Sequence, residues 1–419
     1  MKPINVGLLG IGTVGGGTFT VLKRNEEEIT RRAGRPIRIT TVADKNLELA
    51  RSVAGEGVKL TDDAFSVVTD PEIDIVVELI GGYGIAKELV LKAIENGKHV
   101  VTANKALLAV HGNEIFAAAQ KKGVMVAFEA AVAGGIPIIK ALREGLSANR
   151  IQWLAGIING TTNFILSEMR DKGLPFAEVL KEAQALGYAE ADPTFDIEGV
   201  DAAHKATLMA SIAFGVPVQF DKTYVEGITK LEAADIKYAE QLGYRIKLLG
   251  IARRREQGIE LRVHPTLIPA KRLIANVEGS MNGIMVKSDA AGITMYYGAG
   301  AGSEQTASAV IADLVDVTHD PMLARLRQRL RRQVEHSLSA GQSPASGPVK
   351  VTPRNSPKTA RGMGVTCVFS REEIQRPDAG CSVEGSLNCA GYGSSVMVTA
   401  TFGMVAAEQA LSWVRCRAV

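Results

Sequence analysis

Three changes of pattern along the chain predict an α/β domain built on a parallel sheet, then an α+β domain, then an irregular C-terminal tail. Short β-branched runs alternate with helical patterns over residues 1–130, which is the rhythm of βαβ units. Longer helical stretches mix with strand candidates over 131–303, and a helical pattern over 304–318 is expected to return to the first domain. Clusters of Pro, Gly, Ser and Arg replace this periodicity over 319–419, where we expect the irregular tail.

The expected elements follow from short apolar runs and longer amphipathic stretches. The expected strands of the first domain are 5–10, 37–43, 74–80, 99–103 and 124–129, and its clearest helical patterns cover 86–97 and 106–123. In the second domain we expect helices at 137–147, 175–187 and 201–214, and strands at 151–158, 244–254 and 259–268.

Composition narrows the functional classes. Charged residues make up 22% of the chain and the net charge is +3, which gives no broad basic surface for nucleic acid or an anionic membrane. The N-terminus enters a strand without the layout of a signal peptide, and no uninterrupted apolar run of about 18 residues occurs. We therefore expect a cytoplasmic protein that acts on a small molecule.

A glycine-rich turn follows the first expected strand and opens a helical stretch. The turn reads Gly10-Ile11-Gly12-Thr13-Val14-Gly15. This is the dinucleotide fingerprint in its required context: Gly10 permits the tight turn, and Gly12 lets a pyrophosphate approach the backbone at a helix N-terminus. We expect a Rossmann-like domain that binds NAD or NADP, against the alternative of a structural turn.

Polar residues follow later strands, at the sheet edge where ligands bind in this fold. Asp44 and Lys45 follow the strand 37–43, and because a carboxylate there favours NAD whereas a cation favours NADP, the pair leaves the choice open. Lys105, after Asn104 and the strand 99–103, is expected to face the cofactor.

Tyr83 and Lys87 have the spacing of the proton-transfer pair of short-chain dehydrogenases, but they lie too early in the fold for that role. We interpret Gly81 and Gly82 before them as a turn at a strand end. In the second domain, a polar cluster from Asn159 to Asn163 offers donors suited to a carboxylate, although an ordinary capped helix start explains it equally well.

The stretch LGYAEADPTFDIEGVDAAHK (186–205) interleaves carboxylates with apolar residues and leads into an apolar helix. A solvated acidic loop is the usual explanation of such a charge run. Asp201 and Lys205, however, are four residues apart and project from one helix face. Because Lys205 is expected to be partly desolvated beside Asp201, it suits proton exchange, and we prefer it to the neighbouring His204.

Seven motifs together are similar, in order and spacing, to those of one family. They are GLLGIGTVGGGT, VVELIGG, KHVVTANKALLA, FEAAVAGGIPIIKALREGL, GIINGTTNFIL, the stretch 186–205 and GAGAGSEQTASAVIADLVD. Over residues 3–317 the chain resembles homoserine dehydrogenase. The resemblance implies a catalytic and dimerisation domain after the Rossmann-like one, a homodimer or homotetramer, and NAD(P)-dependent interconversion of L-aspartate 4-semialdehyde and L-homoserine in threonine, methionine and isoleucine biosynthesis.

The resemblance also implies roles for single residues. It places cofactor contacts, beside those of Gly10 and Gly15 in the turn, at Gly12, Thr13, Val14, Lys105, Gly187 and Gly302. It places substrate contacts at Glu190, Asp196 and Asp201, and a proton donor at Lys205, with Lys105 left open as the alternative donor. It implies a monovalent cation, sodium, at Glu129, Val132, Gly134 and Ile136.

Two rival functions are weighed against this one. Phosphorylating oxidation of the same semialdehyde needs a cysteine nucleophile, and all four cysteines lie at or beyond Cys367, outside the enzyme-like part of the chain. A non-catalytic nucleotide-sensing module keeps the glycine-rich turn but has no use for Glu190, Asp201 and Lys205 together.

The tail departs from the family pattern, in which an ACT-type regulatory domain often follows. The surge of Arg and Cys over 319–419 indicates a diverged tail or, as we favour, translation out of the normal reading frame. We predict that deleting 319–419 leaves dehydrogenase activity largely in place, because this composition lacks the alternating apolar pattern of a packed βαββαβ unit. Inhibition of the full chain by threonine would contradict this interpretation.

Overall fold

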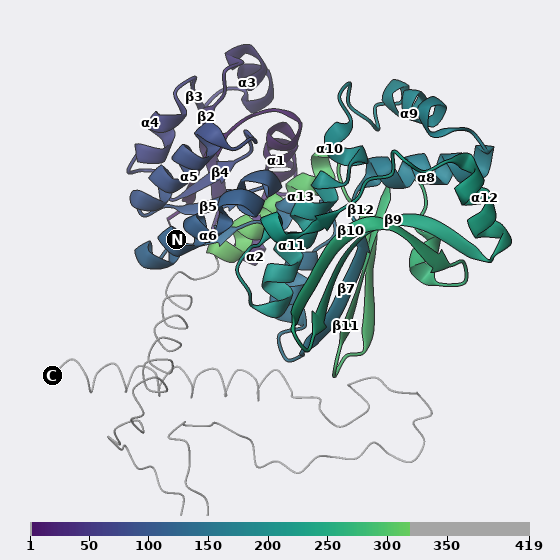
Figure 1. Ribbon diagram of the computed structural model, residues 1–419. Helices are drawn as coiled ribbons and strands as arrows, with labels where there is room; N and C mark the ends of the chain where they lie inside the picture. The colour runs from purple at the N-terminus through teal and green to yellow at the C-terminus, as the bar shows by residue number, and fades with distance from the viewer. Residues whose placement is uncertain (1, 319–419) are drawn as a thin grey trace, which may run out of the picture. The chain divides into compact units, whose positions relative to one another are not determined.

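The computed structural model describes residues 2–318, and these form two six-stranded sheets with helices packed against them (Figure 1). The tail 319–419, with the predictions made for it, lies outside the described residues. Within the described part, no helix is long and apolar enough to cross a membrane.

The first sheet is parallel throughout, in the order β3-β2-β1-β4-β5-β6. Its strands are β1 (Ile4–Leu9), β2 (Ile37–Ala43), β3 (Lys59–Thr61), β4 (Ile75–Glu78), β5 (His99–Thr102) and β6 (Val126–Ala127). The central strands are almost fully buried, as expected for a sheet that is covered on both faces. Their carboxyl ends meet at one edge, where β1 and β4 lie side by side at the point of strand-order reversal.

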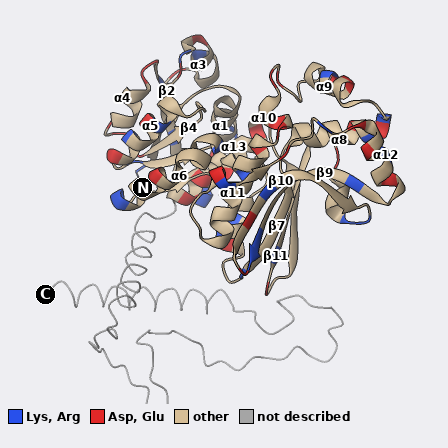
Figure 2. Cartoon of the chain, viewed as in Figure 1, with Lys and Arg blue, Asp and Glu red and all other residues tan. Residues whose placement is uncertain are grey.

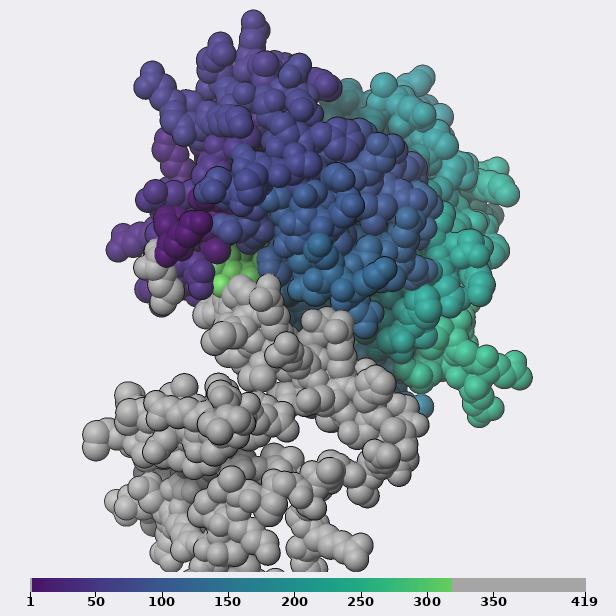
Figure 3. Space-filling model, turned by 90° about the vertical axis from the view of Figure 1, so that its left-hand side faces the viewer, coloured from purple at the N-terminus to yellow at the C-terminus, as the bar shows by residue number. Residues whose placement is uncertain are grey.

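Helices cover both faces of this sheet. They are α1 (Thr13–Arg24), α2 (Glu26–Ala33), α3 (Leu47–Ala54), α4 (Ala64–Thr69), α5 (Gly84–Glu95), α6 (Lys105–Lys122) and α13 (Ser303–Thr318). One apolar core joins α1, α2 and α13 to one face, while α4, α5 and α6 pack on the other. The late helix α13 runs along α1, and Figure 3 shows the green residues of this last described segment beside purple residues near the N-terminus.

The second sheet is mixed, in the order β12-β11-β7-β9-β10-β8. Its strands are β7 (Ile151–Ile157), β8 (Tyr224–Val225), β9 (Tyr244–Arg255), β10 (Gly258–Pro269), β11 (Met281–Ser288) and β12 (Ile293–Ala299). The neighbouring helices are α7 (Ile138–Lys140), α8 (Gly160–Lys172), α9 (Phe176–Ala185), α10 (Thr194–Ile197), α11 (Val200–Phe214) and α12 (Ala233–Gln241). The apolar helix α11 packs on β7, β9 and β10, and also contacts α6 of the first half.

Short helical turns complete the description: η1 (Glu129–Ala131), η3 (Phe220–Lys222) and η4 (Leu273–Asn276) are 3-10 turns, and η2 (Ala141–Gly145) is a π-helical turn. The predicted fold class is confirmed: a Rossmann-like sheet is followed by an α+β half. The expected helix over 137–147 forms only a single α-turn and then widens into η2. Strands β11 and β12 were not predicted.

A buried lysine fastens α8 to the second sheet. Lys247 on β9 is 1% exposed, and its ammonium donates to Val277 O (2.7 Å) and to the amide oxygen of Asn163 on α8 (2.9 Å). Its nitrogen lies 3.3 Å from the Glu278 carboxylate. Burial lowers the pKa of Lys247 to about 8, against the opposing attraction of Glu278. The network fixes α8, whose first residues lie beside α10 and α11.

We predict that Lys247→Met lowers the melting temperature, because buried acceptors left without a donor cost about 1–3 kcal/mol each. From pH 8 to the ordinary lysine pKa of 10.5, the unfolded chain binds the proton that the folded protein has released. The contribution of Lys247 to stability therefore rises with pH in this window. Differential scanning fluorimetry at pH 7.5 and pH 9.5 should show the gap between the two proteins widening, whereas a constant or shrinking gap would show that this lysine has an unperturbed proton affinity.

Candidate functional site

The three fingerprint glycines meet different surroundings at the end of β1. Gly10 has a φ of 94°, which only glycine adopts without strain. A Cβ on Gly15 would lie 2.1 Å from Gly10 O, so its absence lets α1 begin directly against the strand end. A Cβ on Gly12 would meet nothing within 4 Å, which leaves the backbone open on the side where a pyrophosphate would lie.

A cavity of about 670 Å³ adjoins this loop. Its lining includes Gly10, Gly12, Asp44, Lys45, Asp62, Phe65 and Ile80. The Asp44 carboxylate accepts the N–H groups of Ile11 (2.7 Å) and Asn46 (2.8 Å), so it holds the glycine-rich loop as well as facing the cavity. Lys45 is exposed and donates to Asp62 O (3.1 Å). The structure thus brings both predicted ribose-site charges to the cavity, one tied to the backbone and the other on a flexible side chain.

Other predicted cofactor residues lie near the start of two helices. Thr13 and Val14 form the first turn of α1. Gly302, with a φ of 130°, precedes α13, and the neighbouring Ser303 hydroxyl donates to Thr13 O (2.8 Å). Gly302 therefore lies beside the glycine-rich loop despite its distance in sequence. Gly187 lies just after α9, in the second half of the chain.

Asp201 lies between two lysines that come from different halves of the molecule. Its side chain is 5% exposed; Oδ2 is 2.7 Å from Lys205 Nζ, one turn later on α11, and Oδ1 is 3.3 Å from Lys105 Nζ at the start of α6. Lys205 also donates to Ile158 O (2.8 Å). Burial alone would raise the pKa of Asp201, but attraction to Lys205 and then Lys105, with hydrogen bonds, holds it well below the usual range.

Asn159, the N-cap of α8, connects this cluster to a second carboxylate. Its amide nitrogen donates to Asp201 (2.8 Å) and to Asp196 (2.7 Å), while its oxygen caps Thr162 N (2.8 Å). Thr161 donates to the other oxygen of Asp196 (3.1 Å). Asn159 is thus an ordinary helix cap, and its amide also contacts two carboxylates that are predicted to bind substrate.

Four other candidate residues are not part of the hydrogen-bonded cluster around Asp201. Glu190 is exposed in the loop after α9. Lys87 pairs with Glu114 (2.8 Å), and Tyr83 is exposed at the start of α5. His204 is buried between the rings of Phe195 and Phe220, and burial lowers its pKa to about 4.

The four predicted sodium ligands belong to one loop between β6 and α7. The Glu129 carboxylate accepts Ile139 N (2.8 Å) and Lys140 N (2.7 Å), and Glu129 N donates to Asp313 on α13 (2.7 Å). Burial raises the pKa of Glu129, and raises that of Asp313 to about 7. Val132, Gly134 and Ile136 follow η1, with left-handed backbone at Gly134 (φ 48°). Among residues 2–318, no three His, Cys, Asp or Glu side chains converge on a metal position.

Sequence reasoning missed two buried polar residues at the strand ends, Glu78 and Thr102, and the Asp313 partner of Glu129. Glu78 ends the apolar run of β4 and is completely buried. Its carboxylate accepts Ile80 N and Gly81 N, both at 2.9 Å, and the Thr102 hydroxyl at 2.7 Å. The available signal was one carboxylate at the end of a strand that is otherwise apolar.

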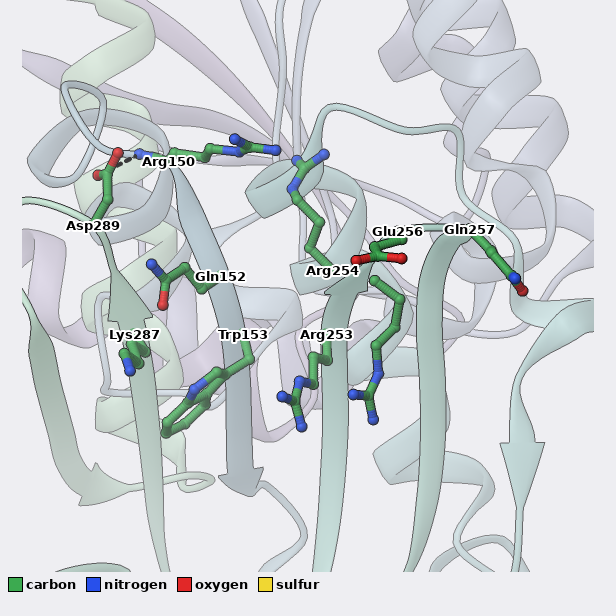
Figure 4. Close-up of a pocket in the computed structure, with 10 residues that line it drawn as sticks. Arg150, Gln152, Trp153, Arg253, Arg254, Glu256, Gln257, Lys287 and Asp289 are labelled. Carbon is green, nitrogen blue, oxygen red and sulfur yellow. Dashed lines mark hydrogen bonds between the residues drawn. The ribbon is translucent and has the colours of Figure 1, made fainter.

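A larger cavity, of about 890 Å³, lies at one end of the second sheet and contains none of the predicted site residues (Figure 4). Half of its ten lining residues are basic, namely Arg150, Arg253, Arg254, Arg255 and Lys287, and the lining also includes Trp153, Glu256 and Asp289. Figure 2 marks Lys and Arg positions in blue on strands of this sheet. Because none of the predicted site residues lines this cavity, we place the chemistry at Asp201 and not here.

Comparison with known proteins identifies the family of both halves of the described chain. Family models described as "Homoserine dehydrogenase, NAD binding domain" and "Homoserine dehydrogenase" match residues 10–129 and 137–315. Homoserine dehydrogenase of Pseudomonas aeruginosa is 70% identical over 325 residues, which cover 77% of this chain and 74% of the relative. The chain belongs to the homoserine dehydrogenase family. By this membership it is an NAD(P)-dependent oxidoreductase.

Solved structures of this family share the fold. The crystal structure of a homoserine dehydrogenase from Thiobacillus denitrificans is 73% identical, with a TM-score of 0.76, over 77% of this chain and 75% of that one. A hyperthermophilic archaeal homoserine dehydrogenase in complex with NADPH, at 24% identity, has a TM-score of 0.65 over 76% of this chain and 98% of that one. The sequence-based prediction of the family is confirmed.

A pair of glycine variants separates cofactor binding from folding. We predict that Gly12→Ala keeps the wild-type melting temperature, because its methyl group enters open space, but weakens NADPH binding by roughly tenfold or more, about 1.4 kcal/mol. Gly15→Ala, which forces a methyl group onto Gly10 O, should destabilise the protein by about 1–3 kcal/mol. Thermal unfolding and fluorescence titration with NADPH measure the two effects, and an unchanged dissociation constant for Gly12→Ala would remove Gly12 from the cofactor site.

Proposed function

We propose that the cluster of Lys105, Asp201 and Lys205 is the active site in which this chain reduces L-aspartate 4-semialdehyde and oxidises L-homoserine. The observation that supports this most directly is a buried carboxylate held between lysines from both halves of the molecule, 2.7 Å from Lys205 and 3.3 Å from Lys105. Lys105 starts a helix at the cofactor-binding edge of the first sheet, whereas Lys205 lies on the helix that covers the second sheet. A substrate at this junction therefore contacts cofactor and catalytic residues together.

Lys205 is the proton donor in this proposal. An ammonium group has three N–H donors; one of Lys205 is directed to Asp201 and one to Ile158 O. The third N–H remains for the aldehyde oxygen of the substrate. A bound nicotinamide would supply hydride to the aldehyde carbon. The aldehyde oxygen, as its C=O bond becomes C–O, takes the proton from Lys205. In the reverse reaction Lys205 accepts that proton from the homoserine hydroxyl.

Lys105 stabilises the negative charge that forms on the substrate oxygen beside Lys205. The Lys105 side chain is one-third exposed and therefore less enclosed than that of Lys205. Its ammonium lies 0.6 Å farther from the Asp201 carboxylate than that of Lys205 does. We assign it the cofactor side of the site and the electrostatic stabilisation of the forming alkoxide. Glu190, on the exposed loop after α9, pairs with the substrate ammonium. Asp196, which accepts a hydrogen bond from the Asn159 amide, contacts the substrate close by.

The cofactor is NADP or NAD. Asp44 is hydrogen-bonded to two backbone N–H groups, whereas Lys45 is exposed and holds only a backbone carbonyl, so Lys45 is free to turn towards a 2′-phosphate. The archaeal relative in complex with NADPH supports use of the phosphorylated cofactor. Gly187 and Gly302 complete the cofactor site from the second half of the chain.

Sodium fits the loop that contains Glu129, Val132, Gly134 and Ile136. Carboxylate and carbonyl oxygens are the hard ligands that such a cation takes. Each Glu129 oxygen accepts one backbone N–H and retains a lone pair. A bound cation would neutralise the buried Glu129 carboxylate and stabilise the connection between the two halves.

We also propose that the chain forms a homodimer or homotetramer through its second half. Leu242 just after α12, Leu273 on η4 and Leu267 on β10 are 73%, 72% and 57% exposed. Large apolar side chains that are this exposed favour burial against a partner. The reaction then belongs to threonine, methionine and isoleucine biosynthesis in the cytoplasm.

The direct experiment mixes the purified full chain with L-homoserine and NAD⁺ or NADP⁺ and follows the absorbance of the reduced cofactor. No reduction with either cofactor would overturn the proposal.

We predict that Lys205→Ala lowers kcat by on the order of 10² or more, the usual scale for a lost general acid, while cofactor affinity stays near that of the wild type. Lys237→Ala, on the exposed surface of α12, is the matched control and should retain normal turnover. Steady-state kinetics and cofactor titration measure both. Undiminished kcat in Lys205→Ala would leave Lys105 as the proton donor.

A further inference from the structure

A closed circuit of hydrogen bonds joins the ends of β4 and β5. Glu78 accepts Ile80 N and Gly81 N through one oxygen and the Thr102 hydroxyl through the other. The Thr102 oxygen accepts Asn104 N (3.0 Å). The circuit closes because the Asn104 amide donates to the carbonyl of Gly82 (2.8 Å), in the loop that Glu78 holds.

The three side chains that form the circuit are buried. Glu78 and Thr102 are fully buried, and Asn104 is 7% exposed. Glu78 and Thr102 are neighbours in the parallel register of β4 and β5, so the bond between them crosses the sheet where its hydrogen-bond ladder ends. Burying a carboxylate is unfavourable unless it is hydrogen-bonded. An apolar residue, as at the other positions of β4, would fill this space without that cost.

One member of the circuit, Asn104, directly precedes Lys105 in the chain. Asn104 is the N-cap of α6, accepting Leu107 N (3.0 Å), and Lys105 is the first residue of that helix. Through Thr102 and Gly82, Asn104 is fixed in position and in orientation. The start of α6, and with it the base of the Lys105 side chain, is therefore set by Glu78 and Thr102 together.

The other half of the circuit is the loop 80–82. Gly81 and Gly82 have φ values of 83° and 74°, two consecutive left-handed residues at the carboxyl end of β4, and Ile80 lines the cavity beside the glycine-rich loop. Such a loop has no regular hydrogen bonds of its own to fix it. Glu78 and Asn104 supply them from the two sides.

We propose that Glu78 and Thr102 are positioning residues that act through Lys105: they hold its helix start and the 80–82 loop in one fixed arrangement, so that its ammonium reaches Asp201 across the domain junction. This inference rests on the proposed function, in which Lys105 takes part in the reaction. We assign Glu78 no contact with the substrate, because it is completely buried and its described hydrogen bonds hold the 80–82 loop and Thr102. The requirement for a fixed Lys105 explains why a buried carboxylate stands where an apolar side chain would pack.

The test removes the Thr102 hydroxyl with almost no change of shape. Thr102→Val deletes the donor to Glu78 and the acceptor for Asn104 N, whereas Thr102→Ser retains both. We expect Thr102→Val to lower kcat/KM for homoserine by roughly tenfold, and Thr102→Ser to recover most of that loss. Asn104→Asp is the second variant: its carboxylate still caps α6 but cannot donate to Gly82 O, and it should show a similar loss.

A double-mutant cycle with Lys105→Ala separates positioning from general destabilisation. If Thr102 acts through Lys105, then Thr102→Val should reduce kcat/KM by less than about twofold in the Lys105→Ala background. A tenfold loss that persists in that background, or a Thr102→Ser variant as impaired as Thr102→Val, overturns the inference. Full activity of Lys105→Ala alone would instead overturn the role of Lys105 in the proposed function, so the two failures are distinguishable.

Discussion

The buried carboxylate of Asp201 is the constraint on which the arrangement of this molecule depends. A carboxylate that is 5% exposed needs compensating charge, and it obtains that charge from Lys205 on its own helix and Lys105 from the other sheet. The two domains must therefore meet in one relative position for Asp201 to be satisfied. The contact of α6 with α11 and the return of α13 along α1 maintain that position by apolar packing.

The hydrogen-bond networks around Asp201 have one feature in common: each fixes the first residues of a helix. Asn159 caps α8 and orients Asp196 and Asp201, and Asn104 caps α6 and carries Lys105. Further along α8, Lys247 ties Asn163 to the second sheet. Because caps are local and strong relative to side-chain flexibility, they set the position of a helix start to within the tolerance that proton transfer needs.

Much of this could be predicted from local sequence patterns. The run IRITTVA is β2 from end to end, the glycine-rich turn lies at the end of β1, and the spacing of Asp201 and Lys205 places them in contact. Contacts between distant segments could not be predicted: Lys87 pairs with Glu114, Asp44 holds Ile11 N, and Asp313 meets Glu129. Strands β11 and β12 were missed because their mixed polar and apolar residues lack a strong periodic signal.

The electrostatics of the cluster narrow the source of the catalytic proton. Asp201 cannot supply it near neutral pH, because Lys205 and Lys105 hold its pKa well below the usual range despite burial. His204 cannot supply it either: burial lowers its pKa to about 4, and the rings of Phe195 and Phe220 flank it. The two ammonium groups beside Asp201 remain. In the proposed site these ammonium groups can both donate a proton and stabilise the negative charge that forms on the substrate oxygen.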